Sequence, residues 1–279
     1  MREGESAVSD LKDLLPRVVE IAKQAGDAIM AIYNNDEDFE TTYKDDRSPL
    51  TKADLLSNEI IVKGLQELAP EIPILSEESK QTPYPERSGW SRFWLVDPID
   101  GTKEFIKRNG EFTVNIALVD SGQPVLGVVH APARTTTYWG AEGEGAFQQN
   151  GGGVAEPMQV TQTHAGLEAI AVVASRSHAG PETVAFLDRL EAANGAIAKV
   201  SAGSSLKLCL VASGEAQLYP RFGPTMEWDT AAAHAVVVQA GGAVTNMEGV
   251  ALRYNKENLL NPFFVVSDGS GLDWKACLE

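Results

Sequence analysis

Apolar residues recur at helical spacing over residues 8–33, and polar residues occupy most of the positions between them. This pattern predicts a long amphipathic helix, in which Pro16 is a candidate kink. The polar stretch 34–48 predicts a loop. Thr51 suits the N-cap of a second helix over 52–68. The helix is expected to end there because a proline follows shortly afterwards.

Short apolar runs bounded by turn formers predict strands in the middle of the chain. The second of these runs ends abruptly at Asp97. The last two are joined by the turn formers 120–122, which predicts an antiparallel pair. The predicted strands cover residues 73–75, 93–96, 112–119 and 124–130.

The second half of the chain alternates between strand-like and helix-like patterns. This alternation predicts an α/β arrangement with helices layered on a sheet, whereas the first half predicts an α+β arrangement with antiparallel pairing. The glycine run 151–153 is a candidate seam, so we expect two closely packed halves, 1–150 and 151–279. The predicted strands of the second half are 170–174, 217–219 and 263–266, and its predicted helices are 181–193, 205–212 and 230–239.

Composition narrows the classes of function. With 279 residues, 43% of them hydrophobic and 22% charged, the chain can bury the core of one or two domains. The formal net charge of −16 argues against binding to nucleic-acid backbones, so we expect no nucleic-acid partner. Cys209 and Cys277 lie far apart in the sequence and suggest no disulfide framework, which fits the reducing cytoplasm.

The sequence also lacks the marks of a membrane protein. Its charged first residues differ from a signal peptide, and its apolar runs are too short to span a bilayer. We therefore expect a cytoplasmic protein with no integral membrane segment. Peripheral attachment to the inner face of the membrane stays open, as does the oligomeric state.

The strongest chemical feature is the segment 94–102, Trp-Leu-Val-Asp-Pro-Ile-Asp-Gly-Thr. A strand delivers Asp97, Pro98 fixes a turn, and Asp100 follows just before a short helical segment. Two converging carboxylates beside free backbone N–H groups suit a hard cation such as Mg²⁺ together with a phosphate. Taken alone, the segment also fits an ordinary Asp-Pro turn with an aspartate N-cap.

Further acidic residues stand at the starts and ends of predicted elements. Glu77-Glu78 follows a short strand, and Asp229 comes after Trp228 at the start of an apolar helix. Taken alone, Asp229 fits an ordinary N-cap, and Asp54 fits a carboxylate in the first turn of a helix. Neither position would indicate a metal site without the others.

In order and spacing, these segments resemble the inositol monophosphatase superfamily, which carries an acidic pair, then Asp-Pro-Ile/Leu-Asp-Gly-Thr, then Trp-Asp. The resemblance covers roughly residues 50–240 and implies a layered αβαβα sandwich. Further segments resemble the CysQ-type 3′(2′),5′-bisphosphate nucleotidases, which convert adenosine 3′,5′-bisphosphate to AMP and phosphate in sulfur metabolism. These segments are 101–115, 175–178, 203–207 and 217–225.

The resemblance also implies roles for individual residues. Two Mg²⁺ ions would activate a water without a covalent intermediate, and lithium would inhibit. Thr102 would orient that water with Asp54 as its partner, and a third, weaker metal beside Asp54 is an option. The amides of Gly101 and Thr102 would hold the scissile phosphate. The implied metal ligands are Glu77, Asp97, the carbonyl of Ile99, Asp100 and Asp229.

A second phosphate, remote from the metals, needs cationic donors. Ser204 and Lys207 are three apart and would share a helix face, and Arg221 follows a Tyr-Pro turn. Taken alone, either cation could equally be a solvated surface charge, and His178 could bind the nucleotide or cap a helix. The implied substrate contacts are Ile99, Asp100, Gly101, Thr102, Lys103, Ser175, His178, Ser204, Lys207, Arg221 and Asp229.

Two other functions remain as alternatives. The nearest is a phosphatase of the same superfamily that acts on inositol monophosphate or fructose 1,6-bisphosphate, although the segments around Lys207 and Arg221 favour a bisphosphonucleotide. The other is a non-catalytic nucleotide sensor on the same scaffold. The sequence retains Thr102 and every expected metal ligand, which argues against a sensor.

Overall fold

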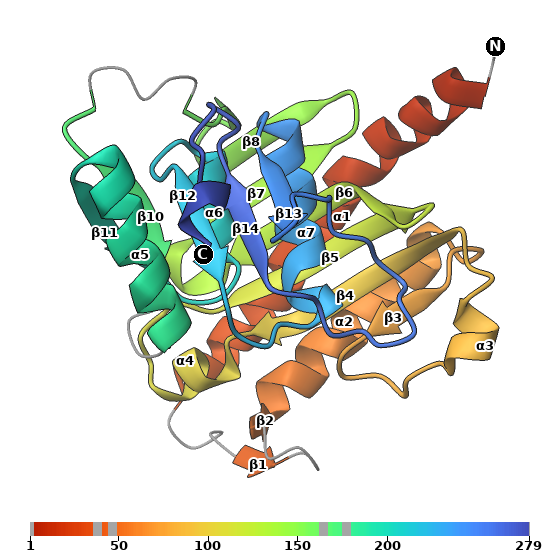
Figure 1. The fold of residues 1–279 in the computed structure, drawn as a ribbon. Helices are drawn as coiled ribbons and strands as arrows, with labels where there is room; N and C mark the ends of the chain where they lie inside the picture. The colour runs from red at the N-terminus through yellow and green to blue at the C-terminus, as the bar shows by residue number, and fades with distance from the viewer. Residues whose placement is uncertain (1–2, 36–40, 44–48, 162–166, 175–179, 279) are drawn as a thin grey trace.

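The chain folds as an αβαβα sandwich in a computed structural model that describes residues 3–35, 41–43, 49–161, 167–174 and 180–278 (Figure 1). A seven-stranded and a five-stranded sheet alternate with layers of helices. The predicted fold class is therefore confirmed. Among the described helices, none is long and apolar enough to cross a membrane.

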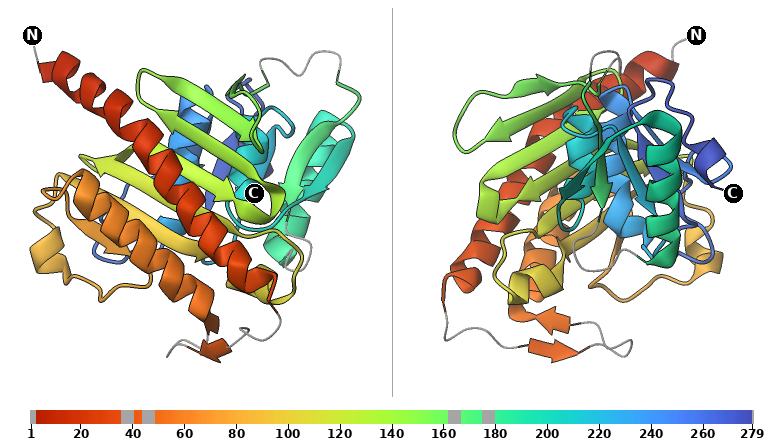
Figure 2. Two further views of the ribbon diagram at one scale, coloured as in Figure 1. Left: turned by 180° about the vertical axis from the view of Figure 1, so that it is seen from behind. Right: turned by 60° about the vertical axis from the view of Figure 1, so that its left-hand side comes forward.

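Two long helices form the first layer and lie side by side across the larger sheet (Figure 2). They are α1 (Glu3–Tyr33), with Pro16 inside it, and α2 (Lys52–Leu68), whose predicted bounds are confirmed. The predicted loop over 34–48 is wrong in part, because β1 (Thr41–Tyr43) pairs antiparallel with β2 (Pro49–Thr51). A strand this short depends on its partner rather than on its own polar sequence.

The larger sheet runs in sequence order from β3 to β9. Its first pair is parallel and its other pairs are antiparallel, including the predicted pair β5–β6. The sequence analysis missed the last three strands. The bounds are β3 (Ile74–Ser76), β4 (Arg92–Asp100), β5 (Thr113–Asp120), β6 (Gln123–Ala131), β7 (Thr136–Ala141), β8 (Gly145–Asn150) and β9 (Glu156–Met158).

Strand β4 separates two parts of the core. Phe93 and Leu95 face the inner helices, whereas Trp94 and Val96 face α1 and α2, as the two-residue period of a strand requires. The sequence predicted that this strand ends at Asp97, and that prediction is wrong. The strand continues to Asp100 with an irregular register between these two residues, because β5 still supplies pairing partners.

The middle layer holds α6 (Leu206–Ala212) and α7 (Glu227–Gln239) between the two sheets. Helix α7 begins at Glu227 rather than at the predicted Thr230. It packs so closely on the larger sheet that a Cβ atom at Gly127 in β6 would overlap the carbonyl oxygen of Ala232. The glycine is therefore required by the approach of the helix.

The five-stranded sheet has the order β11-β10-β12-β14-β13 and carries α5 (Pro181–Asn194) on its outer face. The sequence analysis missed β11 and β13. The division at residue 150 stays a prediction, although β9 still pairs within the larger sheet beyond that point. The strands are β10 (Ile170–Ala174), β11 (Ile197–Ser201), β12 (Leu218–Arg221), β13 (Ala243–Asn246) and β14 (Phe264–Ser267), and the short helices are α3 (Tyr84–Arg87), α4 (Thr102–Ile106), η2 (Pro132–Arg134) and η3 (Lys275–Cys277).

The contact between α7 and β6 predicts a stability effect. Gly127→Ala should lower the free energy of unfolding by about 1–3 kcal/mol, because the new methyl group must push the helix backbone away. Urea denaturation measures the effect. Gly152→Ala, at an exposed turn with open space around it, is the matched control and should change little. Equal effects of the two substitutions would contradict the prediction.

Candidate active site

Three carboxylates meet between the two halves of the chain. Glu77 follows β3, Asp97 lies at the irregularity of β4, and Asp229 lies in the first turn of α7. One carboxylate oxygen from each residue lies within 4.8 Å of the others. The sequence prediction that these residues converge is confirmed, whereas their role as metal ligands stays a prediction.

The cluster is electrostatically unfavourable without a cation. Burial raises the pKa of Asp97 well above its ordinary value, and the negative charges of Glu77 and Asp100 raise it further. Burial and Asp100 likewise raise the pKa of Asp229. Oxygen donors crowded in this way suit hard divalent cations such as Mg²⁺, so the residues fit the expected metal.

The backbone around Asp97 is fixed by local hydrogen bonds. The Ile99 amide donates to Asp97 Oδ1 at 3.1 Å, and the Ser57 hydroxyl donates to the Pro98 carbonyl at 2.8 Å. Asp97 is buried and Asp100 is half-buried, and the charge of Asp100 acts on both Asp97 and Asp229.

Asp54 and Thr102 are in contact, as the sequence analysis expected. The Thr102 hydroxyl donates to Asp54 Oδ1 at 3.1 Å. The other oxygen of Asp54 accepts from the Thr51 amide at 2.8 Å and from the Thr51 hydroxyl at 2.5 Å. Asp54 is thus both the capping-box partner of Thr51, the N-cap of α2, and the acceptor for Thr102, whose oxygen keeps lone pairs that can accept a further hydrogen bond.

The same face of α2 also holds the strand end before Glu77. Asn58, one turn after Asp54, accepts from the Ser76 hydroxyl at 2.7 Å and donates to the Ser79 hydroxyl at 3.3 Å. Residues 76 and 79 flank the acidic pair in sequence. Three segments of the site therefore depend on one helix.

The sequence analysis did not assign a role to Ser205. Its hydroxyl lies 3.0 Å from Asp100 Oδ2 and 2.7 Å from the Asp229 carbonyl, and it accepts from Asn115 Nδ2 at 2.9 Å. Asn115 in turn accepts from the Thr113 hydroxyl at 3.0 Å. The sequence signal for this network was the pair Thr113 and Asn115, which alternate with apolar residues in a buried strand. Buried polar groups need hydrogen-bond partners, so such a pair predicts a polar neighbour from another element.

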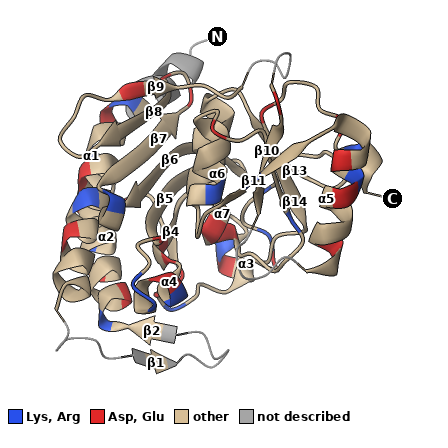
Figure 3. Cartoon of the chain, turned by 90° about the vertical axis from the view of Figure 1, so that its left-hand side faces the viewer, with Lys and Arg blue, Asp and Glu red and all other residues tan. Residues whose placement is uncertain are grey.

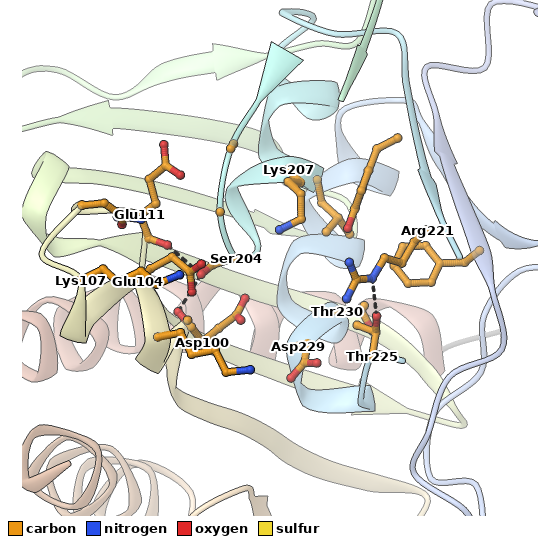
Figure 4. A pocket seen from close by; sticks show the side chains of 18 residues that line it. Asp100, Glu104, Lys107, Glu111, Ser204, Lys207, Arg221, Thr225, Asp229 and Thr230 are labelled. Atoms are coloured by element: carbon orange, nitrogen blue, oxygen red, sulfur yellow. Dashed lines mark hydrogen bonds between the residues drawn. The ribbon is translucent and has the colours of Figure 1, made fainter. Parts of the chain in front are cut away.

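A cavity of about 420 Å³ opens beside the carboxylates. Figure 4 shows Asp100 and Glu104 on one side of it and Lys207 and Arg221 on the other. Lys103 and Lys107 also line the pocket, which is mostly polar, and Lys207 and Arg221 lie across it from Asp100. Figure 3 shows the same gathering of charged positions around α4, α6 and α7. Among the expected substrate contacts, the cavity is lined by Asp100, Gly101, Lys103, Ser204, Lys207, Arg221 and Asp229.

The geometry corrects the expectation for Ser204. It does not share a helix face with Lys207, because α6 begins only at Leu206 and Ser204 has a φ of 50°. The Ser204 hydroxyl lies 2.9 Å from the Asp100 carbonyl and 2.8 Å from the Glu111 carbonyl. These contacts hold Ser204 against the loop at Gly101. Gly101 has a φ of 94°, and a Cβ atom there would overlap the Ser204 hydroxyl, so this position requires glycine.

Two local interpretations are also corrected. Lys207 is half-buried rather than solvated, and burial lowers its pKa although Asp100 opposes that shift. Asp229 is not an N-cap but the third residue of α7, where it accepts from the Met226 amide at 2.8 Å. The predicted contacts Ser175 and His178 lie outside the described residues.

Comparison with known proteins agrees with this geometry. The sequence profile of the inositol monophosphatase family matches residues 10–268. The 3′(2′),5′-bisphosphate nucleotidases CysQ of Salmonella typhimurium and Escherichia coli (strain K12) are each 49% identical over 255 residues, which cover 91% of this chain and 99% of theirs. The crystal structure of CysQ from Bacteroides thetaiotaomicron is 44% identical, with a TM-score of 0.79 over 90% of this chain and 95% of its own.

The acidic cluster predicts a pH-dependent stability difference. Because the pKa of Asp97 is raised, the folded state keeps this proton to a higher pH than the unfolded state does. The free energy of unfolding of wild type therefore falls as pH rises from about 4 through the raised pKa, whereas the side chain of Asp97→Asn stays neutral. In chelator, the melting temperature of Asp97→Asn should therefore rise relative to wild type as the pH increases above about 4. Saturating Mg²⁺ should shrink or reverse the difference, because it binds the native wild type better. A difference independent of both pH and Mg²⁺ would contradict this interpretation.

Proposed function

The chain belongs to the inositol monophosphatase family, and from this premise we propose that it is a Mg²⁺-dependent 3′(2′),5′-bisphosphate nucleotidase. The reaction is the hydrolysis of adenosine 3′,5′-bisphosphate to AMP and phosphate, as part of sulfur metabolism and nucleotide recycling. The observation that carries the proposal is one cavity that is lined by Asp100 and by Asp229 of the acidic cluster, and also by Lys207 and Arg221. CysQ relatives at 49% identity support the same assignment.

The two ends of the cavity suit the two phosphates of such a substrate. The cation-loaded carboxylates would receive the 3′-phosphate that is removed. Lys207 and Arg221, at the other end, would receive the 5′-phosphate, because a guanidinium fork and an ammonium group are the usual partners of phosphate oxygens. A monophosphate would leave these cations unused.

The proposed reaction is direct hydrolysis. The oxygen of a water bonds to phosphorus, the bond from phosphorus to the ribose 3′-oxygen breaks, and that oxygen leaves with a proton. Two Mg²⁺ ions, held by Glu77, Asp97, Asp100, Asp229 and the Ile99 carbonyl, would supply charge neutralisation and acidify the water. Thr102, held by Asp54, accepts a hydrogen bond from the water and so directs its lone pair. The amides of Gly101 and Thr102 orient the scissile phosphate.

The proposal assigns different work to the two halves of the chain. Residues 1–150 carry most of the metal ligands, and residues 151–279 carry the cations and the last ligand, Asp229. We also propose a cytoplasmic location, since both cysteines are buried free thiols of a kind that persists in a reducing compartment.

The first test is phosphate release with Mg²⁺ from adenosine 3′,5′-bisphosphate, 3′-AMP, inositol 1-phosphate and fructose 1,6-bisphosphate. The bisphosphonucleotide should have the highest kcat/KM, chelator should abolish turnover, and Ca²⁺ should inhibit because its coordination is longer and looser. Asp97→Asn should remain folded and lose more than about a hundredfold in kcat, since even the outer partners of metal ligands are worth 10–100-fold. The surface variant Asp13→Asn is the control. Activity that survives chelation, or a preference for inositol 1-phosphate, would disprove the assignment.

The second test separates the two ends of the cavity. Lys207→Ala or Arg221→Ala should lower kcat/KM for adenosine 3′,5′-bisphosphate by roughly ten- to a hundredfold, because each loses a charge-assisted contact to the 5′-phosphate. Turnover of 3′-AMP should change little, since it lacks that group. Lys199→Ala, at an exposed position of β11, is the matched control. An equal loss with both substrates would mean that the cations act at the scissile phosphate or on folding.

A further inference from the structure

The irregularity in β4 interrupts the backbone pairing that would otherwise fix two of the proposed metal ligands. Asn115 of β5 is the register partner of Asp97. Thr113, two residues earlier, is the register partner of Asp100, so β4 contains one residue more than β5 across this stretch. Such an extra residue disrupts the ladder of backbone hydrogen bonds and changes the direction of nearby side chains. The segment between Asp97 and Asp100 therefore needs support from side chains, and the two β5 residues opposite it are placed to give that support.

The side chains of Thr113 and Asn115 point toward the middle layer of helices. They alternate with Val114 and Ile116, which pack in the part of the core that holds α1 and α2. Ala117, two residues further along, packs with the inner helices. Because side chains alternate between the two faces of a strand, Thr113 and Asn115 share the face of Ala117. Both are buried, at 0% and 1% exposure, so their polar groups require partners inside the protein.

Ser205 supplies such a partner from the second half of the chain. It lies just before α6 and is 1% exposed. Asn115 Nδ2 donates to its hydroxyl oxygen at 2.9 Å, and Asn115 Oδ1 accepts from the Thr113 hydroxyl at 3.0 Å. The same Ser205 oxygen lies 3.0 Å from Asp100 Oδ2 and 2.7 Å from the Asp229 carbonyl oxygen. One hydroxyl thus contacts the segments of two proposed metal ligands that come from different halves of the chain.

The number of protons fixes the direction of this chain of hydrogen bonds. A serine hydroxyl donates one proton and accepts through its lone pairs, whereas an ionised carboxylate and a backbone carbonyl only accept. The single proton of Ser205 is therefore needed by Asp100 and by the Asp229 carbonyl. If Asn115 presented its oxygen to Ser205, it would compete for that proton and leave both acceptors without a donor. With the Asn115 amide donating instead, each polar group of the chain has a suitable partner.

We propose that Asn115 and Ser205 are positioning residues for the metal site. The Asn115 amide directs the Ser205 proton toward Asp100 and the start of α7, so the two residues fix how the ligands of the two halves lie relative to each other. The inference rests on the proposed function, because it takes Asp100 and Asp229 as metal ligands. Neither Asn115 nor Ser205 is among the residues that line the cavity, so we expect them to affect the binding of Mg²⁺ and not the binding of the nucleotide.

The first variant is Asn115→Leu, which keeps a side chain of similar size and removes the donor to Ser205. Binding of Mg²⁺, followed by calorimetry without substrate, measures the effect. The dissociation constant should rise by about 10–100-fold, as expected when an outer partner of metal ligands is lost. Ser205→Ala is a smaller change that should weaken binding to the same extent, and it carries the test if Asn115→Leu does not fold.

The matched control is Gln217→Leu, which also replaces a buried side-chain amide. Gln217 is 4% exposed and does not line the cavity. Its Nε2 donates to Thr161 Oγ1 at 2.9 Å, and its Oε1 accepts from the Ala171 amide at 2.8 Å. The control should lower the melting temperature much as Asn115→Leu does, because each leaves buried groups without a partner, but it should leave Mg²⁺ binding unchanged. Equal weakening of Mg²⁺ binding by both substitutions would indicate a general loss of packing and would overturn the inference.

Turnover separates the positioning of metal ligands from other roles. With adenosine 3′,5′-bisphosphate, the Mg²⁺ concentration for half-maximal activity should rise about 10–100-fold in both variants. At saturating Mg²⁺, kcat should return to within about threefold of wild type and KM should stay the same, because the bound metal then holds its own ligands. The double variant should bind Mg²⁺ no more weakly than the weaker single variant, because the two residues act in one chain. A raised KM at saturating Mg²⁺, or additive losses in the double variant, would contradict the inference.

The outcomes separate this inference from the proposed function. If wild type binds Mg²⁺ but does not prefer the bisphosphonucleotide, the proposed function fails, and the Mg²⁺ titrations still decide the roles of Asn115 and Ser205. If wild type shows the preference and both variants bind Mg²⁺ as tightly as wild type, only the inference fails. If wild type binds no Mg²⁺, the proposed function and the inference are both wrong.

Discussion

The mutual repulsion of clustered carboxylates is the constraint around which this molecule is organised. Glu77 and Asp97 come from neighbouring strands of the larger sheet and Asp229 comes from a helix of the middle layer, yet they bring oxygen atoms within 4.8 Å of one another. Burial and neighbouring charge oppose that arrangement in the absence of cations. The fold must therefore supply, through packing and hydrogen bonds, a scaffold strong enough to hold an arrangement that its own electrostatics disfavour.

Two devices provide that scaffold. One face of α2 holds the segments around Thr102, Pro98 and Glu77 by side-chain hydrogen bonds, so much of the first half of the site is tied to one helix. Ser205 then links this half to the second, because its hydroxyl lies between Asp100, Asn115 and the backbone of Asp229. Four of these six bonds join uncharged groups, so they support the arrangement without adding to the repulsion.

The sequence predicted best what depends on local pattern or on a specific motif. The bounds of α2 and β10 and the convergence of Glu77, Asp97 and Asp229 are confirmed. What it missed depends on partners distant in sequence: β11 and β13 exist because neighbouring strands pair with them. The prediction that Ser204 lies on a helix was wrong for a related reason. Ser204 has a left-handed backbone conformation and is held by two carbonyl oxygens, and neither feature produces a periodic pattern in the sequence.

The separation of the ligand set along the chain has a consequence for biosynthesis. A ribosome makes the N-terminal part first, and domains fold as their last required segment emerges. Here Asp229 and the helix that carries it are needed beside Asp97, more than a hundred positions earlier, and α7 packs between the larger sheet and a five-stranded sheet that is completed only by β14. A nascent or truncated chain that lacks this helix cannot assemble the site. The proposed activity therefore requires that translation has passed the last layer of the sandwich, and incomplete chains are expected to be inactive.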